Sequence, residues 1–385
     1  METLTQTARQ SFESTYGHAP SHTAFAPGRV EFIGNHTDYN GGFVLGASLD
    51  LGVAVAASAT EDSRLRVTSD GKTVEAAGEW RDLKPLKGEK AWANYLLGVA
   101  REWACLSKET PKGVDVAVAS NLPSGAGLSS SAALELATAY ALGGVLGQSL
   151  GKLEMARLGR RAENDFVGVP CGILDQGVSA HGEANHLVRI DCRDETFATV
   201  PLPEGTAFHL FNTGIKHALV DSFYADRHRE CMQVRDAVRA EYPDVEYLAF
   251  AEEGMLDGLD LDTHLVRRAQ HVIRENQRVH NCIHALQRGD LDDVGTQLCA
   301  SHASSRDLFE NSLPELDFVV DALRAQPGVI GARLSGGGFG GAVLAFTRDT
   351  YTQVEAQSVG NAFRERFARP LTWLQTSTGP GARLL

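Results

Sequence analysis

The segment PSGAGLSSSA occupies residues 123–132, between a strand-like stretch at 113–123 and a helical stretch rich in alanine and leucine that begins at Ser130. Its glycines let the backbone approach a ligand closely. The following helix start offers unpaired N–H groups at the positive end of the helix dipole, which suits phosphate. No lysine precedes the serines, so the segment is not a Walker-type P-loop. Taken alone, it could also be a glycine-rich turn with serine capping.

Hydrophobic patterning on both sides of this segment predicts further helices and strands. The sequence pattern changes after Asp194, where a strand is followed by several helical stretches. A chain of 385 residues also exceeds what one hydrophobic core usually organises, so we expect two lobes, residues 1–195 and 196–385. The predicted helices cover about 1–18, 92–105, 130–147, 149–166, 218–240, 264–288, 290–308 and 350–367. The predicted strands are two within 43–60, a hairpin at 65–78 around Asp70-Gly71, one at 113–123, one at 209–214, and two joined by a glycine turn at 329–346.

Bulk composition excludes several classes of function. The formal net charge is −13 and no Lys/Arg-rich tract is present, so nucleic acid is not an expected partner. No stretch approaches the roughly 18 apolar residues that a membrane helix needs, and the six cysteines lie far apart without zinc spacing. We therefore expect a cytoplasmic protein with reduced, mostly buried thiols that is a monomer or a weak homo-oligomer.

Two other segments carry candidate chemistry. The stretch PGRVEFIGNHTDYNGG at 27–42 gathers the hydrogen-bonding side chains that a polyhydroxylated ligand needs, although a surface turn rich in Asn and Asp weighs equally. In CGILDQ at 171–176, an aspartate fixed beside an apolar loop, Asp175, could accept a substrate proton, and Arg29 could act with it. The alternative for Asp175 is a turn residue or a helix N-cap.

Two glycine-containing segments lie in the second half. The run SGGGFGG at 335–341 is either a tight hairpin or a backbone surface that lines a phosphate pocket from the second lobe. The acidic stretch at 251–264 lacks the glycine and the closing glutamate of an EF-hand, so we expect a solvated loop there.

Taken in order, these segments resemble the GHMP family of small-molecule kinases, and most closely its galactokinases. The resemblance rests on PGRVEFIGNHTDYNGG at 27–42, LPSGAGLSSSAALE at 122–135 and LSGGGFGGAV at 334–343, with further likeness at 162–176, 212–231 and 301–317. It implies an α+β fold with two lobes, mixed and antiparallel sheets, packed helices and an active site in the cleft between the lobes. It also implies transfer of the γ-phosphoryl group of ATP to the C1 hydroxyl of galactose, as part of galactose metabolism.

The resemblance assigns roles residue by residue. Asp175 would accept the proton of the anomeric hydroxyl, and Arg29 would stabilise the transferring phosphoryl group. Ser131 and Glu163 would hold Mg²⁺. Backbone groups of the loop would wrap the ATP phosphates: Gly125, Ala126, Gly127, Leu128, Ser129, Ser130 and Ser131. The sugar contacts would be Asn35, His36, Thr37, Asp38, Gly172, Gln176 and Tyr224.

The chain departs from the family pattern at the sugar end. Galactokinases usually carry Asn where this chain has Glu31 and Glu where it has Asn35, and an amide can both donate and accept where a carboxylate only accepts. Smaller departures are Gly46, Asn164 and Gly177. Another acceptor, such as N-acetylgalactosamine, arabinose or mannose, therefore stays open. A third alternative is a non-catalytic sugar sensor of this fold, but such sensors lack the Ser-Ala step that is present here at 131–132.

Overall fold

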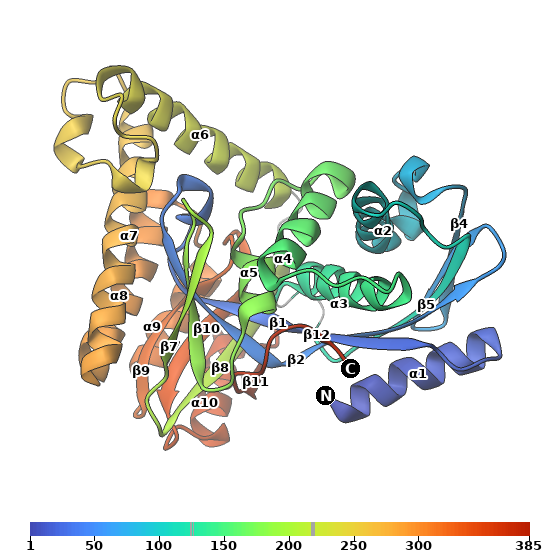
Figure 1. Cartoon of the computed structure of the whole chain (residues 1–385). Coiled ribbons are helices and arrows are strands. Elements are labelled where there is room, and N and C mark those ends of the chain that lie inside the picture. Colours follow the sequence, from blue (N-terminus) through green and yellow to red (C-terminus); the bar gives the residue numbers. More distant parts are fainter. Residues whose placement is uncertain (124, 126, 217–219) are drawn as a thin grey trace.

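The strands of the first half form one mixed sheet (Figure 1). The structure is a computed structural model that describes residues 1–123, 125, 127–216 and 220–385. Six strands of this sheet lie side by side in the order β12, β1, β2, β5, β3 and β4: Arg383–Leu384, His22–Ile33, Phe43–Thr60, Gly113–Ser120, Arg64–Ser69 and Lys72–Ala77. The pair β3 and β5 is parallel and the other pairs are antiparallel. The hairpin predicted around Asp70-Gly71 is confirmed.

Strand β2 is one long strand, so the prediction of two strands within 43–60 is wrong. Its start pairs with β6 (His186–Asp191) and its end pairs with β5, while β1 runs along both halves. The glycines in this strand are close-packing sites. A Cβ added at Gly52 would lie 2.2 Å from the carbonyl oxygen of Ala26, so glycine lets β1 pass close by.

The first sheet also contains two strands from beyond residue 195. Strand β7 (Thr196–Pro201) pairs with β6, and β12 at the chain end pairs with β1. The expected lobe division therefore falls between two strands of the same sheet, and the second sheet begins with β8 at Thr206.

Helices cover both faces of the first sheet, because alternate residues of its strands point to opposite sides. Ala54, Ala56 and Ala117 pack against one helix, α1, whereas Val53, Val55 and Val116 pack against α2 and α3. Helix α3 is apolar on almost all sides and is correspondingly buried. The helices of this half are α1 to α5: Glu2–Tyr16, Asn94–Leu106, Ser130–Val145, Lys152–Arg161 and Leu174–His181.

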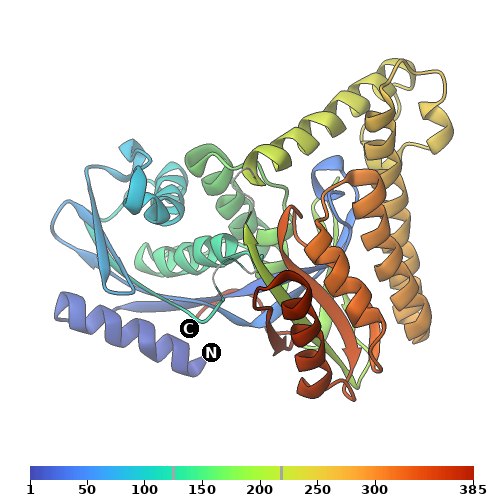
Figure 2. The same ribbon diagram turned by 180° about the vertical axis from the view of Figure 1, so that it is seen from behind.

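The second sheet is antiparallel, with the strand order β11, β8, β10 and β9: Thr372–Thr376, Thr206–Lys216, Gly340–Arg348 and Val329–Ser335. Figure 2 shows α9 (Pro314–Arg324) and α10 (Gln353–Phe367) on one side of it. Helices α7 (Thr263–Arg288) and α8 (Leu291–Ser304) contribute to a core that also contains Phe32 of β1 and Leu45 of β2. A continuous apolar core thus joins the two halves.

The remaining long helix, α6 (Val220–Glu241), extends from the projecting end of α7 towards α4 and α5 (Figure 1). The predicted helix began at 218, and residues 218 and 219 lie outside the described residues. The acidic stretch at 251–264 forms turns and one short 3₁₀ segment, Glu253–Leu256, before α7 begins at Thr263, as expected of a solvated loop.

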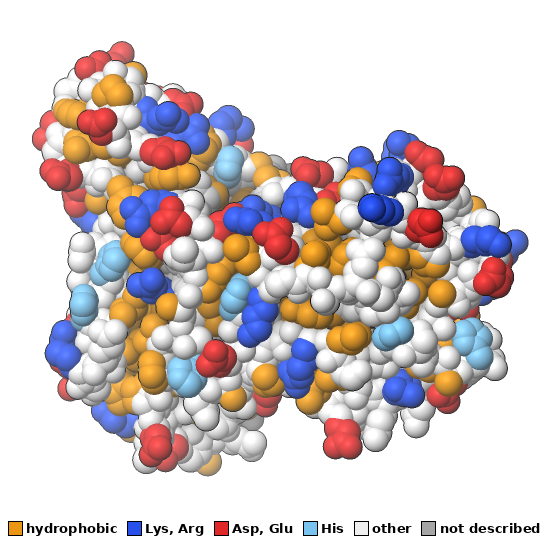
Figure 3. Space-filling model, viewed as in Figure 1, with side chains coloured by type: hydrophobic (Ala, Val, Ile, Leu, Met, Phe, Trp, Pro, Cys, Tyr) orange, Lys and Arg blue, Asp and Glu red, His pale blue; other side chains and the backbone are white. Residues whose placement is uncertain are grey.

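The surface view shows how charged side chains are distributed on one face. On the face in Figure 3, basic and acidic side chains are interspersed, without a continuous basic patch. No helix within the described residues is long and apolar enough to cross a membrane. All six cysteines are free; two are buried, three are half-buried and Cys105 is exposed.

The contact between α8 and β9 gives a prediction for stability. A Cβ at Gly295 would lie 2.0 Å from the carbonyl oxygen of Ile330. We expect Gly295→Ala to lower the free energy of unfolding by about 1–3 kcal/mol, because helix and strand must move apart. The control is Gly254→Ala, where a Cβ meets nothing within 4 Å and the change should stay within about 0.5 kcal/mol. Urea unfolding of both variants measures this, and equal values would contradict the close approach.

Candidate functional site

The nucleotide loop, residues 123–131, leads from β5 into α3 through left-handed backbone positions. Gly125 and Gly127 have φ of 72° and 67°, and Ser129, which precedes the helix, has φ of 51°. Leu128 is buried, and its carbonyl oxygen accepts a hydrogen bond from the backbone N–H of Arg29 at 3.1 Å. Ala126, which we expected among the ATP-binding residues, lies outside the described residues. Ser130 and Ser131 form the first turn of α3, so their N–H groups have no partner within the helix.

Arg29 and Asp175 meet beside this loop. Nε and Nη2 of Arg29 donate to Oδ1 of Asp175 at 2.8 and 2.5 Å, and Nη1 donates to the carbonyl oxygen of Gly127 at 2.8 Å. Oδ2 of Asp175 accepts from the hydroxyl of Ser129 at 2.5 Å. Asp175 lies in the first turn of α5, not in a loop, and its side chain is 24% exposed. The arginine and aspartate inferred from separate motifs therefore form one unit with the nucleotide loop.

Glu163 lies in a π-helical turn, Ala162–Val167, at the end of α4. Burial raises the pKa of its carboxyl group, and the charge of Asp175 raises it further, while hydrogen bonds from Cys171, Gln176 and Ser131 oppose this. Ser131 and Glu163 are thus adjacent, as a shared cation would require. Within the described residues no group of three or more His, Cys, Asp or Glu side chains could hold a metal ion by itself.

Gln176 joins two buried carboxyl groups behind this pair. Its Nε2 donates to Oε2 of Glu163 at 2.7 Å and to Oε2 of Glu135 at 2.9 Å. Glu135 is fully buried on α3, and burial raises the pKa of its carboxyl group well above the ordinary value. Gln176, expected at the sugar, is itself fully buried between these carboxyl groups.

The sugar loop, residues 34–38, follows strand β1. The side chains of three of its expected ligands are engaged within the protein. Asn35 is 1% exposed and has protein partners on both ends of its amide. Nε2 of His36 donates to the carbonyl oxygen of Gly337 at 3.1 Å, so Nδ1 accepts from the Tyr39 hydroxyl at 2.9 Å. Burial lowers the pKa of His36 to about 3, so its ring is neutral. The hydroxyl of Thr37 donates to the carbonyl oxygens of Gly34 and Phe43.

Asp38 has a different environment from its neighbours in the loop. Burial raises the pKa of its carboxyl group to about 7, and the charges of Asp175 and Glu31 contribute. Its carboxylate lies against Gly172, where an added Cβ would be 2.0 Å from Oδ2, so only glycine fits there. Tyr224 of α6 lies close enough that the charges of Asp38 and Asp175, after burial, raise the pKa of its hydroxyl. Asp38, Gly172, Asp175 and Tyr224 therefore converge.

The glycine turn, residues 335–341, approaches both loops. A Cβ at Gly337 would lie 3.0 Å from the Tyr224 ring, and one at Gly127 would lie 3.8 Å from the carbonyl oxygen of Ser335. This placement agrees with the hypothesis that the turn borders the phosphate pocket from the second lobe.

Sequence reasoning missed several polar residues of the site. Glu135 and Arg333 could have been found, because each is a charged residue within an otherwise apolar helix or strand. Glu275 accepts the backbone N–H of Asn35, and Ser305 donates to its side-chain oxygen. Neither carries a comparable local signal, since α7 and the π-helical turn Ser305–Phe309 that contain them are mixed in composition.

Three family models match the chain. A galactokinase galactose-binding signature covers residues 10–59, a GHMP kinase N-terminal domain covers 94–183, and a GHMP kinase C-terminal domain covers 282–369. These ranges contain the sugar loop, the nucleotide loop with Glu163 and Asp175, and the glycine turn.

Whole-chain comparisons agree. The galactokinase of Thermotoga neapolitana is 38% identical over 363 residues, with 93% of this chain and 98% of that protein covered. The galactokinase of Actinobacillus pleuropneumoniae serotype 5b is 38% identical, with 89% and 90% covered. The crystal structure of Lactococcus lactis galactokinase complexed with galactose superposes with a TM-score of 0.91 at 30% identity, over 98% of both chains. Mevalonate kinase of Methanococcus jannaschii shares the fold at 18% identity, with a TM-score of 0.67, 93% of this chain and 99% of that one.

The raised pKa of Asp38 gives a pH prediction. The folded state holds the proton of this carboxyl group more tightly than the unfolded state does, so the bound proton stabilises the fold. This contribution to the free energy of unfolding is complete below about pH 4 and is lost as the pH rises through about 7. Asn cannot ionise, so Asp38→Asn does not lose stability in this way. The free energy of unfolding of the variant, relative to the parent, should therefore increase by on the order of 1–3 kcal/mol from pH 5 to pH 8.

Urea unfolding at the two pH values measures this gain. Exposed Asp260, changed to Asn, is the control and should show no such gain. A pH-independent difference for Asp38→Asn would show that its carboxyl group is ionised throughout this range.

Proposed function

Because the chain belongs to the galactokinases, ATP-dependent enzymes of the GHMP kinase family, we propose that it transfers the γ-phosphoryl group of ATP to the C1 hydroxyl of galactose. The products would be galactose 1-phosphate and ADP. The observation that carries this proposal is the unit of Arg29, Asp175 and Ser129, which places a proton acceptor and a fixed positive charge at the nucleotide loop.

The geometry supports the following roles. The C1 oxygen attacks the γ-phosphorus, the bond from phosphorus to the bridging oxygen of ADP breaks, and Asp175 takes the hydroxyl proton. Arg29 holds Asp175 in place and puts positive charge where negative charge develops. Phosphoryl transfer depends mainly on positioning and charge neutralisation, so this set is sufficient without a covalent enzyme intermediate.

Mg²⁺ fits the residues beside the loop. Ser131 and Glu163 would hold it, with the remaining ligands supplied by phosphate oxygens and water, as is usual for this ion. When bound with ATP, it would neutralise phosphate charge. The protein's part is to keep Glu163 aimed at Ser131, which the hydrogen bonds from Gln176 and Cys171 do.

Asp38, Tyr224 and the backbone of Gly172 are the groups best placed to bind the sugar hydroxyls. A carboxyl group and a phenol beside bare backbone offer both donors and acceptors. Their convergence on Asp175 would bring the C1 hydroxyl next to its proton acceptor.

A coupled assay that follows ADP formation tests the acceptor. We expect galactose to give the highest kcat/KM in a panel that includes N-acetylgalactosamine, arabinose and mannose, because family membership rests on a galactose-binding signature. If another sugar gave a higher kcat/KM, that sugar and not galactose would be the preferred acceptor. Binding of ATP and galactose without turnover would instead support a sensor.

Asp175→Asn tests the proton acceptor. The amide keeps the shape but cannot take a proton, so kcat should fall by about 10²- to 10⁴-fold, while the Kd for ATP should change no more than a few-fold. Exposed Asp257, changed to Asn, is the control and should keep the parent rate. An unchanged kcat for Asp175→Asn would remove the proton-accepting role of Asp175.

A further inference from the structure

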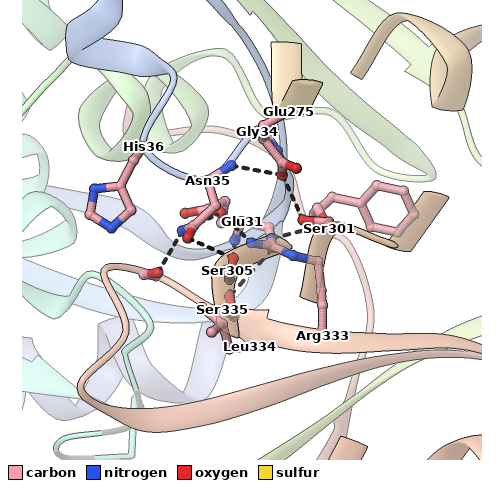
Figure 4. A network of polar contacts seen from close by, with 12 residues as sticks. Glu31, Gly34, Asn35, His36, Glu275, Ser301, Ser305, Arg333, Leu334 and Ser335 are labelled. Atoms are coloured by element: carbon pink, nitrogen blue, oxygen red, sulfur yellow. Dashed lines mark hydrogen bonds and ion pairs between the residues drawn. The ribbon is translucent and has the colours of Figure 1, made fainter. Parts of the chain in front are cut away.

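Asn35 uses all of its hydrogen-bonding capacity within the protein, and Figure 4 shows part of the polar network around it. Its backbone N–H donates to Oε1 of Glu275 at 3.1 Å, and its backbone carbonyl oxygen accepts from Nε2 of His271 at 3.0 Å. Its side-chain Nδ2 donates to Oε1 of Glu31 at 3.0 Å and to the carbonyl oxygen of Gly336 at 2.8 Å.

The oxygen of the same amide also has hydrogen-bond donors within the protein. Oδ1 of Asn35 accepts from the hydroxyl of Ser305 at 3.2 Å and from Nδ2 of Asn311 at 2.9 Å. A side-chain amide offers two donor hydrogens and two acceptor lone pairs. All four are engaged, and the side chain is 1% exposed, so Asn35 has no group left for a sugar hydroxyl.

Glu31 and Arg333 anchor this amide. Nη2 of Arg333 donates to Oε1 of Glu31 at 2.9 Å, and Nη1 donates to the carbonyl oxygens of Glu31 and Phe32 at 3.3 Å. Arg333 is fully buried and Glu31 is 3% exposed. Burial raises the pKa of Glu31, although the charges of Arg333 and Arg29 act in the opposite direction. The exchange of residue types between positions 31 and 35 therefore leaves a carboxylate beside the buried arginine and an amide bridging to the second lobe.

The bridge reaches the phosphate side of the site. Gly336, the acceptor of the Asn35 amide, belongs to the glycine turn, and the next residue, Gly337, accepts from His36 and from Asn311. The glycine turn in turn borders the nucleotide loop, since a Cβ at Gly336 would lie 3.9 Å from the carbonyl oxygen of Gly127.

We propose that Asn35 is a positioning residue and not a sugar ligand. With Glu31 and Arg333 it forms an inter-lobe clamp that ties the sugar loop to the glycine turn and so sets the acceptor pocket against the nucleotide loop. The inference rests on the proposed function, because it concerns the same acceptor and nucleotide. The sugar is then recognised by Asp38, Tyr224 and Gly172, with no direct contact from position 35.

Asn35→Asp tests the clamp with almost no change of shape. It replaces the donor Nδ2 by an oxygen that faces two acceptors, Glu31 and Gly336. We expect kcat/KM for galactose to fall at least tenfold and the KM values for galactose and ATP both to rise. The double variant Glu31→Gln/Asn35→Asp restores a donor opposite the new carboxylate and should recover at least fivefold. A double variant that is no better than the single variant would contradict the clamp.

Deoxy sugars separate positioning from direct contact. The ratio of kcat/KM for galactose to that for 4-deoxygalactose or 6-deoxygalactose reports each hydroxyl's contribution. If Asn35 only positions the loop, Asn35→Asp lowers all three values by the same factor and leaves both ratios within twofold of the parent. A ratio that collapses towards one in the variant would show that Asn35 contacts that hydroxyl, and would overturn the proposal.

A milder variant covers the case in which Asn35→Asp does not fold. Ser305→Ala removes one donor to Oδ1 of Asn35, and should raise both KM values two- to fivefold with unchanged deoxy ratios. The matched control is Asn94→Asp, a buried amide that bonds the backbone of Leu86 away from the site. It should lower Tm without changing either KM. Unchanged KM values for Ser305→Ala would contradict the clamp.

Nucleotide binding distinguishes failure of the clamp from failure of the proposed function. Turnover of galactose by the parent tests the function by itself. ATP binding, measured by calorimetry without sugar, tests the clamp even if galactose is not the acceptor. We expect Ser305→Ala and Asn35→Asp to raise the Kd for ATP about three- to tenfold. Parent-like ATP affinity in a folded Asn35→Asp variant would show that the sugar loop and the nucleotide loop are independent.

Discussion

A buried charge needs a partner, and in this protein the partners lie on different lobes. Arg333 on the second sheet is paired with Glu31 on the first, and Glu275 on α7 accepts the backbone N–H groups of Gly34 and Asn35. Burial alone would raise the pKa of Glu275, but the charges of Arg278 and Arg333 and the hydrogen bond from Ser301 bring it below its ordinary value, so this carboxylate stays ionised. Removing one member of such a pair leaves an uncompensated charge, which is far costlier than losing a surface ion pair. The sugar loop is therefore held by contacts that neither lobe could make alone.

The geometry of the site depends on these buried contacts between the two lobes. Strand β1 ends at the sugar loop and also carries Arg29, whose guanidinium holds Asp175 and the nucleotide loop together. Fixing the end of β1 thus fixes Asp175, the nucleotide loop and the sugar loop with respect to one another. The two π-helical turns contribute in the same way, since one carries Glu163 and the other carries Ser305, and such turns are often found at functional sites.

Sequence reasoning performed best where the signal is local. The helices at 92–105, 264–288 and 350–367 and the hairpin at 65–78 are confirmed, because periodicity and turn residues report directly on short segments. It did not place α5, β6, β7 or α9, which are short elements whose partners are distant in sequence. At 43–60 the residue pattern predicted two strands, whereas pairing with β1 keeps β2 continuous.

By itself, the sequence determined the family, because family membership depends on residue types at fixed spacing within a few motifs. It also singled out Arg29 and Asp175, which the structure pairs. The hydrogen-bond environment of Asn35 was decided only by the tertiary structure. The side-chain hydrogen-bond partners of Asn35 are Glu31, Gly336, Ser305 and Asn311, so they meet only where the fold brings together β1, the glycine turn and the chain around the π-helical turn Ser305–Phe309. The number of hydrogen bonds that a side chain can make is a property of its residue type. Which groups make those bonds depends on the neighbours that the fold places around it.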